Sequence, residues 1–107
     1  MCGIVGFTST QPWDSDVLIS MVETLDHRGP DVAGFHRDPE IEFGHKRLTI
    51  IAPNGGAQPR VDSDTGDVLV YNGEIYGYLD HAKYLRELGI ELTDNSDTEV
   101  LFKSIQQ

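Results

Sequence analysis

Residues 41–51 of this chain read IEFGHKRLTII, and this stretch constrains the fold more than any other. Side chains on a β-strand point to opposite faces in turn, so the stretch predicts a strand with His45 and Arg47 on one face and Leu48 on the other. An arginine within an apolar strand needs a partner for its charge. We expect the partner of Arg47 to be an acidic residue of this chain or a bound carboxylate, whose two oxygens fit the guanidinium fork.

Further strands and helices are indicated by the spacing of apolar residues on both sides of this stretch. Short apolar runs bounded by glycine, proline or aspartate predict strands at Cys2–Phe7, at Val32–Arg37, and in a hairpin that joins Val61 to Val68–Tyr71. Helical spacing predicts amphipathic helices whose inward residues are Val17, Leu18, Met21, Val22 and Leu25 in the first, Leu79, Ala82, Leu85 and Leu88 in the second, and Val100, Leu101 and Ile105 in the third. This order of elements is typical of an α+β layered domain and not of an alternating doubly wound fold.

Helix ends carry signals of their own. Ser96-Asp97-Thr98-Glu99 fits a capping box, with the serine as N-cap and the glutamate at the third helical position, so a helix is predicted to begin there. The carboxylate of Asp97 is expected to favour the positive end of that helix or to bind the ammonium group of a ligand. Asp14 or Ser15 is the predicted N-cap of the first helix, and Gly89 is predicted to end the second.

Length, charge and cysteine content exclude several classes of protein. The chain has 107 residues and a net charge of −10, from 18 acidic and 8 basic residues, so we expect a single domain that binds no nucleic acid. With one cysteine it has no intrachain disulfide. The apolar run at the N-terminus is too short for a signal peptide or a membrane span, which predicts a cytoplasmic protein without membrane contact. No zinc-ligand spacing occurs, so no metal site is expected and the histidines are expected to be structural or exposed.

Two features have both a chemical and a structural interpretation. Removal of Met1 would leave Cys2 with a thiol and a free α-amine, which is the arrangement of an N-terminal nucleophile; otherwise Cys2 is a small buried apolar residue. Asn72-Gly73 supplies a side-chain amide and a glycine N–H, which suit an oxyanion site. The same dipeptide is also a common tight-turn signal.

Six motifs occur in an order that resembles the class II glutamine amidotransferases, which are N-terminal-nucleophile hydrolases, and in particular their asparagine synthetase branch. The motifs are Met1–Gly6, His27–Asp31 with Gly34, His45–Ile50, Gly56–Pro59, Asn72–Tyr76 and Ser96–Glu99. The resemblance extends from Met1 to about Leu101. Within the second motif, Arg28 and Asp31 are expected to shape the loop.

The resemblance implies a catalytic role for three of these residues. Cys2 attacks the side-chain amide of glutamine and forms a thioester, while its α-amine moves the protons. Asn72 and the backbone N–H of Gly73 hold the oxyanion.

The resemblance also implies how glutamine is bound. Arg47 binds the α-carboxylate, Asp97 and Glu74 bind the α-ammonium group, and Leu48 and Ile50 line the pocket. Fixing the α-carboxylate and the α-ammonium group places the side-chain amide beside the sulfur. The shorter asparagine is discriminated against, because its amide ends about one methylene short of the thiol.

The expected fold is the N-terminal part of an α-β-β-α sandwich with antiparallel sheets, and residues 1–107 form the N-terminal portion of a glutamine amidotransferase type 2 domain. The expected activity is glutamine hydrolysis that supplies ammonia to an asparagine-synthetase-like partner or domain. The alternative is a non-catalytic module that binds a partner or glutamine. No cofactor is expected here, because ATP and magnesium belong to a separate synthetase domain. A homo-oligomer or a complementing synthetase chain is the expected partner.

Overall fold

Two antiparallel sheets and three helices make up the computed structural model, which describes residues 2–8, 15–28, 30–48 and 56–107. The elements in chain order are β1 (Gly3–Thr8), α1 (Ser15–Glu23), β2 (Val32–Arg37), β3 (Ile41–Arg47), β4 (Arg60–Val61), β5 (Val68–Leu69), α2 (Tyr78–Glu87) and α3 (Asp97–Ile105). This is an α+β fold with antiparallel sheets, as predicted. None of the helices within those ranges has the length and apolar character needed to cross a membrane.

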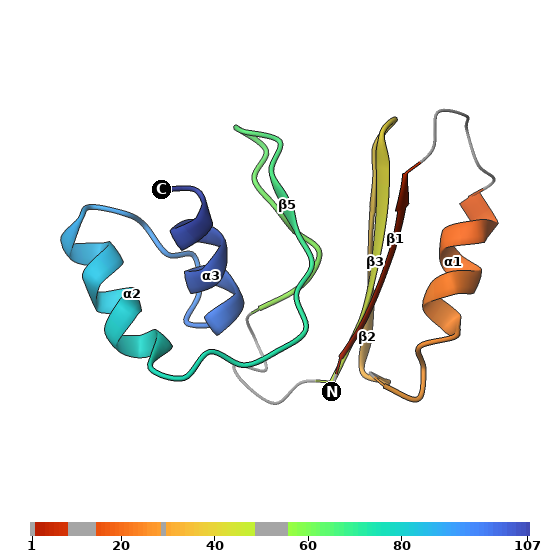
Figure 1. The fold of residues 1–107 in the computed structure, drawn as a ribbon, viewed down its shortest axis with the longest axis horizontal. Coiled ribbons are helices and arrows are strands. Elements are labelled where there is room, and N and C mark those ends of the chain that lie inside the picture. Colours follow the sequence, from red (N-terminus) through yellow and green to blue (C-terminus); the bar gives the residue numbers. More distant parts are fainter. Residues whose placement is uncertain (1, 9–14, 29, 49–55) are drawn as a thin grey trace.

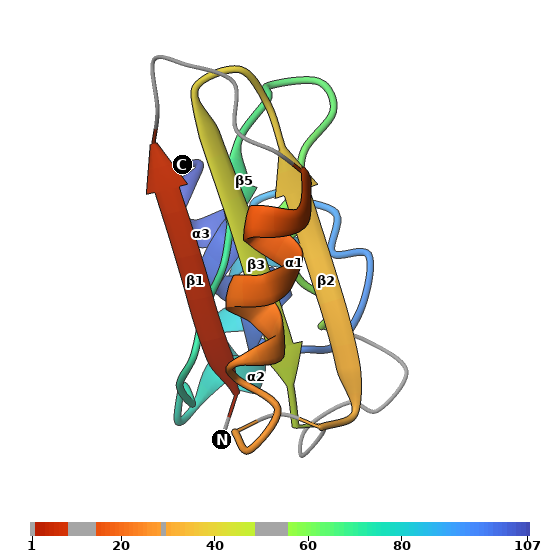
Figure 2. The ribbon, with the colours of Figure 1, turned by 90° about the vertical axis from the view of Figure 1, so that its right-hand side faces the viewer.

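The elements are stacked in layers along the longest axis of the molecule (Figure 1). Helix α1 lies at one end and crosses the face of the sheet with strand order β1-β3-β2, as seen when the molecule is turned (Figure 2). The β4-β5 ribbon lies on the opposite side of that sheet, and α3 and then α2 follow beyond it. Both sheets are thus enclosed between helices.

Strand β3 lies at the centre of the larger sheet and faces both halves of the molecule. It pairs with β1, with Gly3 opposite Lys46, and with β2, with Gly34 opposite His45. On the face toward α1, Lys46 lies 2.8 Å from a carboxylate oxygen of Asp26. On the other face His45 is buried, so the predicted alternation along this strand holds. Residues 49–51, the last part of the predicted strand, lie outside the described ranges.

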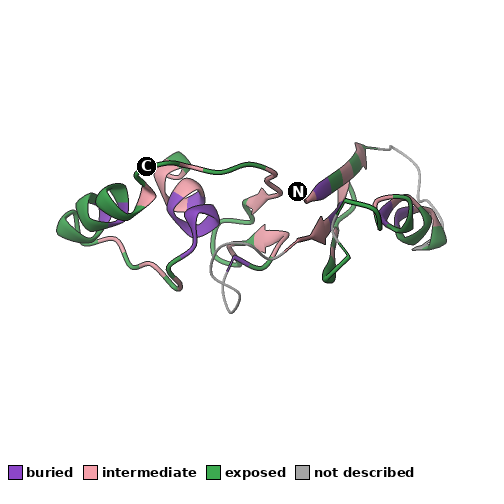
Figure 3. Ribbon diagram, turned by 90° about the horizontal axis from the view of Figure 1, so that it is seen from below, coloured by how far each residue is buried: buried purple, intermediate pink, exposed green. Residues whose placement is uncertain are grey.

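The buried side chains form separate groups in the two halves (Figure 3). Leu18 and Val22 of α1 are almost fully buried on the larger sheet. The other group is held between α2 and α3 and consists of Ala82, Leu85 and Val100, with Tyr78, Ile90 and Leu92 packed around them.

The prediction of the inward face was partly wrong for α2 and α3. Leu79 is 62% exposed and Leu88 57% exposed. A helix turns by about 100° per residue, so these leucines lie roughly a quarter turn to either side of the face centred on Ala82 and Leu85. In α3, Ile105 is exposed as well. Tertiary contacts, and not spacing alone, select the buried face.

The predicted capping box forms only in part. Ser96 is the N-cap of α3, and its hydroxyl accepts a hydrogen bond of 3.1 Å from the N–H of Glu99. The Glu99 side chain does not return to the N-cap, because it accepts from the N–H of Thr93 and pairs with Arg60. The N–H of Ser96 bonds to Asp94 instead.

The predictions for the ends of the other helices had mixed outcomes. Ser15 is the first residue of α1 and therefore not its N-cap, and Asp14 lies outside the described ranges. Gly89 follows α2 in a left-handed conformation with φ of 83°, as the prediction of a helix end there requires.

We predict that Gly34→Ala destabilises the fold. A Cβ at Gly34 would overlap the backbone carbonyl oxygen of Gln58, so β2 and this loop would have to separate. Overpacking of this kind lowers the free energy of unfolding by about 1–3 kcal/mol, which urea unfolding measures. Ser63→Ala, at an exposed turn position, is the control and should stay within about 0.5 kcal/mol of the parent. Equal stability of Gly34→Ala and the parent would contradict this close approach.

Candidate active site

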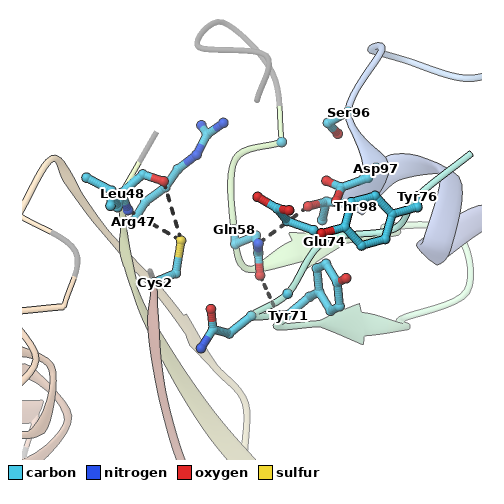
Figure 4. A pocket seen from close by; sticks show the side chains of 13 residues that line it. Cys2, Arg47, Leu48, Gln58, Tyr71, Glu74, Tyr76, Ser96, Asp97 and Thr98 are labelled. Atoms are coloured by element: carbon cyan, nitrogen blue, oxygen red, sulfur yellow. Dashed lines mark hydrogen bonds between the residues drawn. The ribbon is translucent and has the colours of Figure 1, made fainter. Parts of the chain in front are cut away.

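A pocket of about 450 Å³ opens between the end of the larger sheet and the segments that surround the N-terminus of α3 (Figure 4). That size suits a small-molecule ligand. Its lining residues are Cys2, Arg47, Leu48, Gly56, Gln58, Tyr71, Asn72, Gly73, Glu74, Tyr76, Ser96, Asp97 and Thr98. They come from distant parts of the sequence, so folding assembles the pocket.

Nearly all of the predicted site residues meet in this pocket. Cys2, Arg47 and Leu48 lie on one side of it, Glu74 and Asp97 lie on the other, and Gln58 projects between the two groups (Figure 4). Asn72 and Gly73 also line it. Ile50 lies outside the described ranges. The catalytic and binding roles assigned to these residues remain predictions.

The thiol of Cys2 rests against the end of β3. Its sulfur accepts a hydrogen bond of 3.3 Å from the N–H of Leu48 and lies 3.6 Å from the carbonyl oxygen of the same residue. The side chain of Arg28 donates a 3.2 Å hydrogen bond to the backbone carbonyl of Cys2. The N–H of Asp31 bonds to the carbonyl of Arg47. The loop that contains Arg28 and Asp31 therefore contacts the backbone of two site residues, in agreement with its predicted structural role.

Gly56 forms the wall of the pocket next to Arg47. It has a φ of 70°, which disfavours residues with a side chain. A Cβ there would lie 3.2 Å from the guanidinium Nη2 of Arg47 and 3.1 Å from the Cβ of Ser96. The N–H of Gly56 donates a 3.0 Å hydrogen bond to Asp94. Backbone conformation and this hydrogen bond thus set the space available beside the arginine.

Asp97 connects the start of α3 to the segment that contains Asn72 and Gly73. It is only 7% exposed, and its carboxylate accepts a 3.2 Å hydrogen bond from the N–H of Ile75. This position lets it favour the helix N-terminus and line the pocket at the same time.

Sequence reasoning did not identify the contacts made by the backbone of Tyr71. Its N–H donates to the side-chain oxygen of Gln58, and its carbonyl accepts a 3.2 Å hydrogen bond from Nε2 of His45. The amide nitrogen of Gln58 lies 3.5 Å from the hydroxyl of Thr98. The motif Gly56–Pro59 includes Gln58, but its partners Tyr71 and Thr98 are far from it in sequence.

Sequence reasoning also missed a group of ion pairs behind the pocket. Arg60 of β4 pairs with the carboxylates of Asp94 and Glu99. The side chain of Glu99 is 2% exposed and that of Arg60 is 17% exposed. Burial alone would raise the pKa of Asp94, but hydrogen bonds from the Gly56 backbone, Ser96 and Arg60 outweigh it and lower this pKa well below its usual value. These contacts keep Asp94 ionised and hydrogen-bonded to Gly56 in the pocket wall.

The surroundings of the pocket also shift the pKa of Tyr71, which lines it, and of the nearby His45. Burial, followed by the charge of Arg47, lowers the pKa of His45, although its hydrogen bond to Tyr71 opposes this. Burial, followed by the charges of Asp97 and Glu74, raises the pKa of Tyr71. The lowered pKa favours the neutral form of His45 near pH 7, and the raised pKa keeps the Tyr71 hydroxyl protonated to a higher pH. Within the described residues, no cluster of His, Cys, Asp or Glu has the arrangement of a metal site.

Comparison with known proteins gives one consistent family. The profile of the family described as "Glutamine amidotransferase domain" matches residues 1–107. Asparagine synthetase [glutamine-hydrolyzing] 3 and 1 of Bacillus subtilis (strain 168) are 38% and 39% identical, over 97% and 94% of this chain. The asparagine synthetase [glutamine-hydrolyzing] of Zea mays is 35% identical over 94% of it. The chain spans only 17–18% of the length of these relatives.

We predict that Arg60→Met destabilises the protein through the charges it leaves behind. Loss of one partner of a buried ion pair costs about 3–5 kcal/mol, which urea unfolding at pH 7 measures. Adding Glu99→Gln should restore part of that loss, since it removes the most buried of the unpaired charges. Arg86→Met, at an exposed arginine that bonds Asn95, is the control and should change the stability little. An equally small change for Arg60→Met would refute the prediction.

We also predict a dependence of stability on pH that originates at His45. Its pKa in the folded state is below the ordinary value of 6.5, so the unfolded chain binds the proton more tightly. The stability that the neutral His45 side chain contributes is complete above pH 6.5. It is lost as the pH falls from there through the pKa of His45 in the folded state. Unfolding measured between pH 7.5 and about pH 5 should show this slope. His45→Gln should reduce it, whereas the exposed His81→Gln should not; an unchanged slope in His45→Gln would exclude this origin.

Proposed function

The chain belongs to the glutamine amidotransferase domain family, and from that premise we propose that it hydrolyses the side-chain amide of glutamine through Cys2 and supplies the ammonia to an asparagine-synthetase-like partner or domain. The observation that carries this proposal is that a thiol, a cationic side chain, two carboxylates and an Asn-Gly pair line one pocket. Each of these groups matches a requirement of amide hydrolysis on an amino acid.

Removal of Met1 would expose the α-amine of Cys2. That amine takes the thiol proton, and the sulfur attacks the amide carbon of glutamine to give a tetrahedral intermediate. The intermediate then collapses as its C–N bond breaks. The departing nitrogen takes the proton from the protonated α-amine of Cys2 and leaves as ammonia. Water activated by the same amine then attacks the thioester, and its C–S bond breaks to release glutamate and regenerate the thiol.

The negative oxygen of both tetrahedral intermediates needs hydrogen-bond donors. The side-chain amide of Asn72 and the N–H of Gly73 are two donors among the residues that line the pocket. Donors already in position stabilise charge that develops only in the transition state. We assign the oxyanion role to these two groups.

The two charged groups on the α-carbon of glutamine match side chains on opposite sides of the pocket. Arg47 lies on the side of Cys2 and suits the α-carboxylate, whereas Glu74 and Asp97 lie across from it and suit the α-ammonium group (Figure 4). Leu48 supplies apolar surface for the methylenes, together with Ile50 by the family pattern. Binding of both charged groups fixes the α-carbon and so holds the side-chain amide beside the sulfur, which disfavours asparagine because its amide falls about one methylene short.

The layered arrangement supports assignment to the N-terminal-nucleophile hydrolase fold. Two antiparallel sheets lie between helices, with β1 beginning directly after Cys2. Residues 1–107 are proposed to be the N-terminal portion of a type 2 glutamine amidotransferase domain. The proposed glutaminase reaction needs no cofactor. ATP and magnesium would act in a synthetase domain, supplied by the same protein, a second copy or a separate chain.

We predict that the purified protein, with removal of Met1 verified by intact mass, releases glutamate from glutamine. Cys2→Ala should reduce release to background, because no other described residue of the pocket is a thiol nucleophile. Arg47→Met should raise KM by about 10–100-fold, as expected for the loss of a charge-assisted hydrogen bond of about 1.5–3 kcal/mol, with a smaller effect on kcat. Arg86→Met is the control.

The outcomes separate the two interpretations of the pocket. Glutamate release that is lost in Cys2→Ala supports the glutaminase. A folded protein that lacks Met1 and binds glutamine without turnover would refute the hydrolase and favour a module that binds glutamine or a partner.

A further inference from the structure

We propose that His45 and Gln58 are positioning residues, which hold the backbone of Tyr71 from two sides and thereby fix Asn72 and Gly73 relative to Cys2. This inference rests on the function proposed above, since it concerns the geometry of the oxyanion site. His45 and Gln58 do not take part in the proposed reaction themselves, and their proposed role is to hold the residues that do.

Both backbone groups of Tyr71 are bonded by side chains instead of by a strand partner. Strand β5 ends at Leu69, so Tyr71 lies beyond the ladder. Its N–H donates to Oε1 of Gln58 and its carbonyl lies 3.2 Å from Nε2 of His45. A carbonyl only accepts hydrogen bonds, so His45 must carry its proton on Nε2. Loss of either contact would leave a partly buried backbone group unpaired, which favours movement of Tyr71 away from its present position.

The contact from His45 ties Tyr71 to the sheet that positions the nucleophile. His45 is 1% exposed and lies on β3, opposite Ile4 of β1. Cys2 directly precedes β1, and its sulfur bonds the backbone of Leu48 just beyond the end of β3. The carbonyl of Tyr71, which belongs to the peptide bond to Asn72, is therefore held by the same pair of strands that place the sulfur.

The contact to Gln58 ties Tyr71 to a second reference point. The amide nitrogen of Gln58 lies 3.5 Å from the hydroxyl of Thr98, the residue after Asp97 at the start of α3. The backbone carbonyl of Gln58 packs against Gly34 of β2, where a Cβ would overlap it. Gln58 thus links Tyr71 to the larger sheet and to the helix that carries Asp97.

These contacts predict an effect on kcat more than on KM. Oxyanion donors act on charge that exists only in the transition state, so their displacement slows the chemical step and leaves substrate binding almost unchanged. Removal of one such donor costs about 100–1,000-fold in kcat. Because Asn72 and Gly73 themselves remain, we expect a smaller loss, on the order of 10–100-fold.

The test compares substitutions that remove the contacts with one that keeps a donor. Gln58→Met and His45→Met retain side-chain length but cannot bond Tyr71, whereas His45→Gln keeps an N–H donor. Expected results are a 10–100-fold loss of kcat with KM within about threefold of the parent for both methionine variants, and substantial recovery of kcat in His45→Gln. Gln107→Met, at an exposed residue, is the matched control. If His45→Met does not fold, Gln58→Met and His45→Gln provide the test.

Unchanged kcat in Gln58→Met, or a rise in KM with kcat preserved, would overturn the proposal. A second measurement separates its failure from that of the proposed function. Amide hydrogen exchange of Tyr71 should accelerate at least tenfold in Gln58→Met and not in Gln107→Met, whether or not glutamine is hydrolysed. Unchanged exchange overturns the proposed contact even in an active enzyme. A parent protein that is inactive, yet shows the accelerated exchange, would refute the glutaminase and leave the contact intact.

Discussion

The hydrogen bond from His45 to the carbonyl of Tyr71 joins the three-stranded sheet to the part of the chain that carries Asn72 and Gly73. It exists because side chains alternate along β3. Gly44, which has no side chain, leaves room on one face for Val22 and Leu18 of α1. The next residue, His45, points to the other half of the molecule. A central strand can therefore support a helix on one face and the candidate active-site pocket on the other.

The charges around the pocket follow from the need to pair buried ions. The chain has many more acidic than basic residues, and carboxylates gather near the start of α3. Arg60 pairs with Asp94 and Glu99 behind the pocket. Asp97 and Glu74 line the pocket, across from Arg47 (Figure 4). A cationic group facing carboxylates across a small pocket is complementary to a molecule with one charge of each sign, such as a free α-amino acid.

Local patterns in the sequence predicted those features that depend on neighbouring residues. The alternation along β3 and the Ser96 cap are set by geometry within a few residues, and both occur in the structure. Leu79 and Ile105 were misplaced, because partner elements choose which part of an apolar stripe is buried. The contacts of Gln58 and Arg60 span tens of residues. No periodic pattern of residues predicts such contacts. The family motif includes Gln58 but does not predict that its side chain bonds Tyr71 and Thr98.

Because the site is divided between two halves of the molecule, a bound substrate would link binding to the alignment of the reacting groups. Cys2 directly precedes β1 and Arg47 ends β3, whereas Asn72 and Gly73 follow β5 and Asp97 begins α3. A glutamine bound as proposed would touch Arg47 with its α-carboxylate and Asp97 with its α-ammonium group, and would thus bridge the two halves. Its binding energy would then favour the arrangement in which the sulfur and the oxyanion donors face the same carbon atom. Asparagine could make the same two contacts, but its amide would end about one methylene short of the sulfur, so the same binding energy would not bring the reacting carbon into place.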